Sequence, residues 1–359
     1  MARATVSLDQ AAPVGGTEAI AAQQASRAAA QAAAAEELDP QDWGRVFPFD
    51  GFQGNGPSAP RNLQQMAMWP TYVVRRLQDD QKMYKLFSFN FHEGIDIFTS
   101  YSGFGMPELS IHALELALEK TCDPLLYQHF QGASFREAYE IKATARHVLM
   151  SHKKPPVHVF RNINDKMPKE VNQVLDGLEA TAVADDETKM QAFGEMKQYL
   201  TEVEPKLFPP KASPTGGTEQ HRTGFCERQM KPCRLWRGRV SAEQQAPKMT
   251  IKIAGMTCKD WSRMNKTRMG HYGPSGRTEL VELFEIRHVR YDVVLIECTP
   301  DQDIELLKEL LEHIYHIETM VWGSENVAVA ARRKRRWTLL RLRPAAGGRY
   351  TIVLGILKS

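Results

Sequence analysis

The chain has 359 residues, of which 42% are hydrophobic and 25% are charged, and its formal net charge is +3. This balance excludes recruitment of nucleic acid by overall charge, so such binding would have to come from local basic clusters. Five irregularly spaced cysteines argue against a disulfide framework and favour a reducing compartment. No apolar run approaches the roughly 20 residues that span a bilayer, so we expect no membrane association.

Residues 1–62 are predicted to form a disordered, alanine-rich tail and linker. The stretch AIAAQQASRAAAQAAAAEE at 19–37 has high helix propensity but few large side chains to bury. Asp9 and Glu18 disfavour an organelle transit peptide without excluding one.

Short apolar runs then alternate with helical periods, which is typical of an α/β sheet. The region 63–163 is predicted to be the cofactor-binding half of the domain, and 249–343 the catalytic half. Strands are predicted at 94–100, 135–141, 156–160, 249–255 and 291–297, and helices at 106–120, at 142–153 and from about residue 304.

Residues 164–248 break this rhythm and are predicted to be a helical or irregular insertion, with one helix at 188–204. The segment 344–359 is predicted to be a short C-terminal hairpin or tail. In the hairpin form, RYTIVLGIL at 349–357 would pair with WTLLRLR at 337–343.

The segment DIFTSYSGFGM at 96–106 is the first candidate site. A strand that runs into small residues and then a helix brings backbone amides close to a ligand. Glu140 follows the next predicted strand, where a carboxylate can hold a ribose. A tight turn and a solvated acid would explain both features equally well, and composition does not distinguish one nucleotide-like cofactor from another.

The segment AGMTCKDWS at 254–262 places Cys258 directly after a strand, where a nucleophile is presented. Lys259 and Arg263 could activate this thiol, whose ordinary pKa is about 8.5. The alternative is a buried cysteine that acts as a small hydrophobic residue. Glu297 ends the strand YDVVLIE and could hold a proton beside this loop, or could simply favour the start of a helix.

The run ARRKRRW at 331–337 holds five consecutive basic residues followed by Trp337. It could neutralise phosphates, and it could also be a solvated charge run or a nuclear-import signal. We therefore expect nuclear localisation. The spacing of His221, Cys226 and Cys233 matches no common zinc motif, so no metal site is predicted.

In this order the motifs resemble those of the DNA cytosine-5 methyltransferase family, over residues 88 to about 343. The family runs Asp-Leu-Phe-x-Gly-x-Gly-Gly, an acidic ribose ligand, Asp-Ile, Pro-Cys-Gln-x-Phe-Ser, Glu-Asn-Val and Gln-x-Arg-x-Arg. The matching positions here are Asp96-Ile97-Phe98 with Ser100, Ser102 and Gly103, then Glu140, Asn162-Ile163, Thr257–Ser262, Glu297-Cys298-Thr299, and Arg332, Lys334 and Arg336.

The resemblance implies a doubly wound, Rossmann-like sheet of the S-adenosylmethionine-dependent methyltransferases, with DNA as partner. Cys258 would add to a flipped cytosine, and Glu297 would support protonation of its ring. An RNA cytosine-5 methyltransferase and a catalytically silent nucleic-acid-binding or scaffold domain are the alternatives. The implied site residues are Asp96, Phe98, Ser100, Ser102, Gly103, Glu140 and Asn162 for S-adenosylmethionine, and Cys258, Glu297, Lys334 and Arg336 for catalysis.

The chain also departs from the family pattern. Serines replace two loop glycines, Asn162 replaces an aspartate, Thr257 replaces the proline before the nucleophile, and Cys298 replaces an asparagine. The resemblance implies a target-recognition segment, for which a chain that ends at Ser359 leaves no room. We therefore expect slow methyl transfer and weak DNA binding through phosphate contacts, without sequence preference.

Overall fold

The computed structural model describes most of the region between Trp69 and Arg343. These residues belong to one compact unit, which spans Trp43–Ser359. The predicted tail and C-terminal segment lie outside the described residues, as do His221 and Arg332. None of the described helices is long and apolar enough to cross a membrane. The described ranges are 69–79, 93–121, 131–182, 185–207, 223–235, 248–323 and 334–343.

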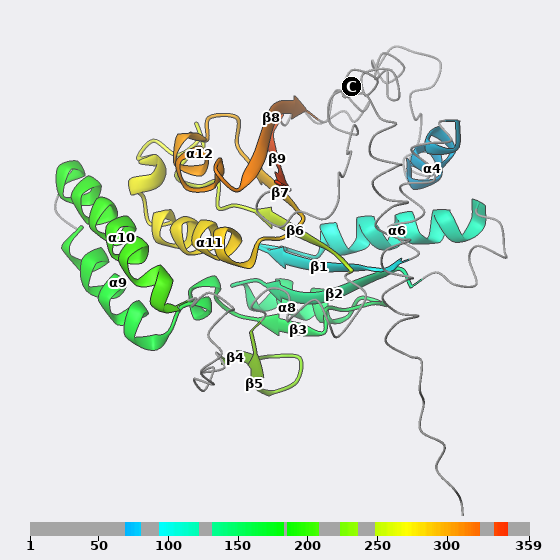
Figure 1. The fold of residues 1–359 in the computed structure, drawn as a ribbon, viewed down its shortest axis with the longest axis horizontal. Coiled ribbons are helices and arrows are strands. Elements are labelled where there is room, and N and C mark those ends of the chain that lie inside the picture. The colour runs from blue at the N-terminus through cyan, green and yellow to red at the C-terminus, as the bar shows by residue number, and fades with distance from the viewer. Residues whose placement is uncertain are drawn as a thin grey trace, which may run out of the picture. The chain divides into compact units, whose positions relative to one another are not determined.

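In this part of the chain nine strands form a single sheet, seen at the centre of Figure 1. Its five parallel strands match the five apolar runs predicted as strands. All six residues of β1 are buried, the pattern of a parallel sheet that is covered on both faces. The parallel strands are β1 (Ile95–Ser100), β2 (Ala133–Tyr139), β3 (His158–Phe160), β6 (Met249–Gly255) and β7 (Val293–Cys298), and the others are β4 (Thr223–Cys226), β5 (Lys231–Arg234), β8 (Tyr315–Gly323) and β9 (Lys334–Leu342).

The strand order is β5-β4-β3-β2-β1-β6-β7-β9-β8. The chain builds β2 and β3 on one side of β1 and later places β6 and β7 on the other, so the order reverses between β1 and β6. The strand β9 runs antiparallel between β7 and β8. This order confirms the predicted doubly wound, Rossmann-like sheet.

The terminal hairpin predicted between 337–343 and 349–357 is wrong. In the structure β9 is hydrogen-bonded on one edge to β7 and on the other to β8. A strand has only two edges, so no place remains beside β9 for a further strand. The actual partner, β8, precedes β9 in the chain.

Helices cover both faces of the sheet. On one face Val74 and Leu118 belong to a buried cluster with Ile97. On the other face Leu283 and Leu307 belong to a larger cluster with Phe98. The helices predicted at 106–120, at 142–153 and after 304 are confirmed. The helices outside the insertion are α4 (Trp69–Asp79), α6 (Met106–Thr121), α8 (Ala143–Met150), α11 (Gly276–Val289) and α12 (Glu305–Leu311), with the 3-10 helix η4 (Gly270–Tyr272).

The predicted insertion is more regular than its sequence suggests. It contains the 3-10 helix η3 (Ile163–Lys166), α9 (Lys169–Thr181) and α10 (Asp186–Leu207), which confirms the helix predicted at 188–204. The helices α9 and α10 pack against each other, and α10 also contacts α11, as Figure 1 shows. The hairpin β4–β5 extends the sheet beyond β3.

The helix α11 is not predicted from the sequence, although it is the most deeply enclosed of the described helices. Eleven of its 14 residues are buried, including Glu282 and Glu285. Because these acidic side chains point into the protein, no polar face marks the helix in the sequence.

Candidate active site at the carboxyl edge of the sheet

The segments that follow β1, β6 and β7 meet where the strand order reverses. Doubly wound sheets bind ligands outside the carboxyl ends of their strands at such a point. Gly255 ends β6, and a Cβ atom there would lie 3.4 Å from the carbonyl oxygen of Tyr101 and 3.7 Å from Oε2 of Glu297. Glu297 was predicted to lie beside the Cys258 loop only if β6 and β7 are neighbours, and they are.

The loop after β1 has an uncommon backbone conformation. The φ angle of Tyr101 is 56°, in the left-handed region that bulky residues rarely adopt. The Tyr101 amide donates to the carbonyl of Tyr139 at 2.8 Å, and its hydroxyl donates to the carbonyl of Thr278 at 3.2 Å. Such strain persists only where neighbouring contacts fix it, and it concentrates at ligand sites. Tyr101 therefore joins the candidate site.

Ser102, one of the two serines in place of family glycines, bonds inside the protein. Its hydroxyl donates to Oγ1 of Thr99 at 2.7 Å, and Thr99 donates in turn to Glu108 at 2.6 Å. Burial raises the pKa of Glu108. The network fastens the loop to the first turn of α6, and the Ser102 hydroxyl is turned away from the solvent side of the loop.

Ser100, the other serine, touches a buried group of four charges. Lys252 donates to its hydroxyl at 2.6 Å and contacts Glu282 at 3.0 Å, while Lys166 contacts Glu285 at 2.9 Å. Burial lowers the pKa of Lys252. Burial alone would raise the pKa of Glu282, but attraction to Lys166 and Lys252 lowers it. This buried ion cluster fastens η3 and α11 to β6 and to the end of β1.

Glu140 follows β2, at the position predicted for a ribose ligand. One carboxylate oxygen accepts the N–H of Gly103 at 2.8 Å, and the other accepts the N–H of Lys142 at 2.8 Å. A carboxylate offers about four acceptor positions, so it can still bind two hydroxyls. The neighbouring side chains of Phe104 and Ile141 are 60% and 67% exposed. An acidic acceptor beside exposed apolar side chains fits the ribose and adenine of S-adenosylmethionine.

Asp96, Phe98 and Asn162 do not contribute free side chains to this loop. Asp96 lies about 13 Å from the end of β1, at roughly 3.3 Å per residue. It pairs with Arg136 at 3.8 Å. Phe98 is 1% exposed, and its ring lies 5.1 Å from that of Tyr291. Asn162 caps η3 through its side chain. In the structure the side chains of Asp96, Phe98 and Asn162 therefore make contacts within the protein, and their assignment to cofactor binding stays a prediction.

Cys258 is half-buried in a loop that is anchored on two sides. Asp260 is 3% exposed and accepts the N–H of Ser275, the residue before α11, at 2.9 Å. The dipole of α11 also favours a carboxylate at this end. Arg263 binds both oxygens of Asp301, at 2.7 and 2.8 Å. Its charge thus joins the Cys258 loop to the segment after β7, a different role from the predicted activation of the thiol.

Cys298 is the other described cysteine near this loop. It is fully buried, and burial raises the pKa of its thiol to about 12. Such a thiol holds almost no thiolate at neutral pH, and the thiolate is the nucleophile. Cys226 and Cys233 lie at the distant β4–β5 edge. Among the described cysteines, Cys258 alone is both accessible and at the carboxyl edge.

Glu297 pairs with Arg335, whose Nε atom lies 2.5 Å from its Oε1 atom. Glu297 is opposite Trp337 in the β7–β9 pairing, and residues two apart on a strand share a face, so Arg335 lies on the face of Glu297. Arg336 faces the other way and donates to the carbonyl of Pro300 at 2.6 Å. Lys334, which shares that face with Arg336, is exposed. The predicted residues Lys334 and Arg336 thus lie on the face of β9 that points away from Glu297.

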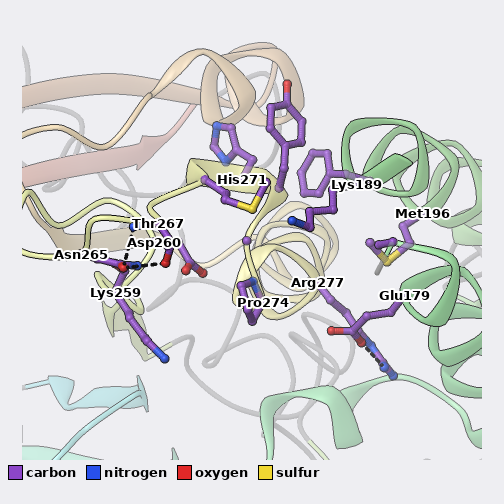
Figure 2. A pocket seen from close by; sticks show the side chains of 15 residues that line it. Glu179, Lys189, Met196, Lys259, Asp260, Asn265, Thr267, His271, Pro274 and Arg277 are labelled. Atoms are coloured by element: carbon purple, nitrogen blue, oxygen red, sulfur yellow. Dashed lines mark hydrogen bonds and ion pairs between the residues drawn. The ribbon is translucent and has the colours of Figure 1, made fainter. Parts of the chain in front are cut away.

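A pocket of about 350 Å³ lies beside the Cys258 loop. Figure 2 shows Lys189 and Met196 of α10 reaching it from one side, and Asp260 and Thr267 of the loop from the other. Neither the Cys258 nor the Glu140 side chain lines it. It is a cavity between the Cys258 loop and the helical insertion.

Tyr101, Asp260 and Arg335 are part of this arrangement but are not predicted from the sequence. Because side chains alternate between the two faces of a strand, Arg335 can be placed on the same face as Trp337 and Glu297. This placement requires knowing that β9 pairs with β7. Asp260 follows Cys258 by two residues, yet its role depends on α11. No sequence signal marks the left-handed backbone of Tyr101.

No family model and no curated protein matches the chain. Among solved structures it is similar to a protein from E. coli described as a prophage-encoded DNA modification methyltransferase, at 12% identity and a TM-score of 0.35, over 70% of this chain and 47% of that chain. It is also similar to S. pombe Dnmt2 methyltransferase, at 13% identity and a TM-score of 0.34, over 69% and 50%. For the methyltransferase EhMeth of Entamoeba histolytica the values are 12% and 0.35, over 70% and 54%. The chain spans about half the length of these structures.

Proposed function

We propose that the chain is an S-adenosylmethionine-dependent cytosine-5 methyltransferase that acts on DNA, with Cys258 as its nucleophile. The observation that carries this proposal is the meeting of the Cys258 loop, Glu297 and the loop after β1 where the strand order reverses. The order of the family-like motifs in the sequence supports it.

The reaction requires a thiolate and a proton donor at one ring. The Cys258 sulfur forms a bond to carbon 6 of a flipped cytosine, while Glu297 gives a proton to ring nitrogen 3. The electron pair that reaches carbon 5 makes this carbon nucleophilic. S-adenosylmethionine, when bound, supplies the methyl group. A water molecule then takes the proton of carbon 5, and the electron pair of that C–H bond forms the double bond to carbon 6 while the Cys258 sulfur leaves as a thiolate. Nitrogen 3 returns its proton to Glu297.

Methyl transfer to paired substrates tests the proposal directly. The full chain would be incubated with tritiated S-adenosylmethionine and either a cytosine-containing DNA duplex, the same duplex with 5-methylcytosine at every cytosine, or RNA of the same sequence. We expect label in the first substrate alone. Label in RNA alone would replace DNA with RNA as the substrate. Bound cofactor without transfer to any substrate would favour a catalytically silent domain.

Glu140→Gln is expected to weaken S-adenosylmethionine binding. A hydrogen bond to a charged group contributes about 1.5–3 kcal/mol, which corresponds to roughly a tenfold to hundredfold rise in Kd. Titration calorimetry on the full chain measures this change. Glu119→Gln, at an exposed position on α6, is the matched control and should bind as the unaltered chain does. Equal affinity in all three proteins would remove Glu140 from the cofactor site.

Arg335→Ala is expected to lower kcat by about a hundredfold with a smaller change in KM, because Glu297 loses the partner that orients its carboxylate. Steady-state methyl transfer measures both constants. Lys334→Ala removes the same charge from the exposed opposite face and should change KM more than kcat. A fall in kcat that is equal in the two variants would indicate a general charge effect and would argue against positioning by Arg335.

A further inference from the structure

Three potential metal ligands meet at the β4–β5 end of the sheet, away from the candidate active site. They are His158 of β3, Cys226 of β4 and Cys233 of β5. One ligand atom from each, a ring nitrogen and two sulfurs, all lie within 4.8 Å of one another. Both cysteines are buried and His158 is partly buried.

We propose that this cluster binds a zinc ion. Zinc–sulfur bonds of about 2.3 Å and zinc–nitrogen bonds of about 2.0 Å place tetrahedral ligand atoms roughly 3.3–3.8 Å apart. Contraction by about 1 Å, within reach of side-chain rotation, would convert the observed spacing into a coordination shell. Two thiolates and one imidazole are a ligand set that zinc prefers.

His158 provides an independent indication of a missing ligand. Its Nδ1 atom is buried and has no hydrogen-bond partner among the described residues. An imidazole nitrogen without a hydrogen-bond partner is available to coordinate a metal ion.

The two thiols can supply the negative charge that zinc requires. Zinc binding would release two protons, one from each thiol, and would leave a neutral unit of one dication and two thiolates. Oε1 of Gln229 lies 3.2 Å from the Cys233 sulfur, so this oxygen or a water molecule can complete the tetrahedron.

The position of the cluster gives the ion a structural role. The strands β3 and β4 are paired through one residue pair, Phe160 with Cys226, whereas β4 and β5 share four pairs. The β4–β5 hairpin is therefore held to the sheet by few hydrogen bonds. A metal that joins His158 to both hairpin strands would fasten it. The sequence does not predict this site because His158 lies far from the cysteines along the chain.

Metal analysis of the tag-free full chain, purified without chelators, tests the proposal. We expect close to one zinc ion per chain by inductively coupled plasma mass spectrometry. Cys226→Ser, Cys233→Ser and His158→Ala should each lower the zinc content to background. Replacement of the zinc by cobalt should give the thiolate-to-cobalt charge-transfer band and the strong visible bands of a tetrahedral site.

Two matched controls separate this site from other cysteines and histidines. Cys258 and His316 lie in other parts of the protein, so the variants Cys258→Ser and His316→Ala should retain the zinc. The unaltered chain remains decisive even if a ligand variant fails to fold. The proposal would be overturned by an unaltered chain that holds no zinc and gives no cobalt spectrum, by zinc that persists in both cysteine variants, or by a Cys226–Cys233 disulfide in protein alkylated at lysis.

Discussion

Replacement of Cys258 by alanine is expected to abolish both methyl transfer and covalent capture of a duplex that contains 5-fluorocytosine. The fluorine on carbon 5 cannot leave as a proton does, so the bond between the thiol and carbon 6 persists after methyl transfer. Loss of a nucleophile reduces kcat by on the order of 10⁴-fold or more in enzymes that use covalent catalysis. A denaturing gel shift and peptide mass spectrometry would detect the adduct at this residue.

Cys298→Ala is the matched control. This residue is buried and its thiol has a pKa of about 12, so its removal should leave the adduct in place. An adduct that survives Cys258→Ala, or that maps to any other cysteine, would contradict the assignment. Loss of the adduct in both variants would mean that the two thiols act together, which the proposed mechanism does not include.

Lys252→Met is expected to lower the free energy of unfolding by about 3–5 kcal/mol, because it leaves a buried carboxylate without its partner. Lys252 and Glu282 are both 0% exposed, and their ion pair spans 3.0 Å. The remaining cluster would hold two carboxylates against the single ammonium group of Lys166. Urea unfolding of the full chain, followed by tryptophan fluorescence, measures the change.

A second substitution makes this prediction specific. The double variant Lys252→Met with Glu282→Leu removes both charges and should recover part of the lost stability. Lys308→Met breaks a surface pair with Glu305 and should leave the free energy of unfolding nearly unchanged. The single variant Glu282→Leu completes the comparison. If the double variant loses as much stability as the two single variants together, the two charges do not stabilise each other.

The central strands could be predicted because their sequences carry the signal themselves. The strand β7 contains VVLI and β6 contains IKIA, and such apolar runs between turns are typical of strands covered on both faces. The hairpin β4–β5 has the sequences TGFC and KPCR, which contain no comparable run. Its strands depend on pairing with each other and with β3, and that pairing cannot be seen locally.

The helix α11 also could not be predicted from its local sequence. Its inward face includes Glu282 and Glu285, which the sequence alone presents as solvent-exposed charges. Their partners are Lys252 on β6 and Lys166 on η3, so the burial of these charges depends on contacts between distant segments. Local periodicity therefore does not identify a helix that is enclosed by charge pairing.

The candidate site also contains some residues that the sequence predicts and others that it does not. Motif order predicts Cys258, Glu140 and Glu297, because each follows an apolar strand at the same edge of the sheet. The role of Arg335 depends on the register of β9 against β7, and the role of Asp260 depends on where α11 begins. Residues that act by contact across the sheet emerge only once the strands are paired.

The two faces of β9 also restrict which changes of length the chain can tolerate. A shift of β9 by a single residue would exchange its faces, placing Arg336 beside Glu297 and removing the contact that Arg336 makes with the Pro300 carbonyl. A single-residue insertion or deletion inside β9 would exchange the faces of every residue on one side of it, so we expect the length of β9 itself to be constrained.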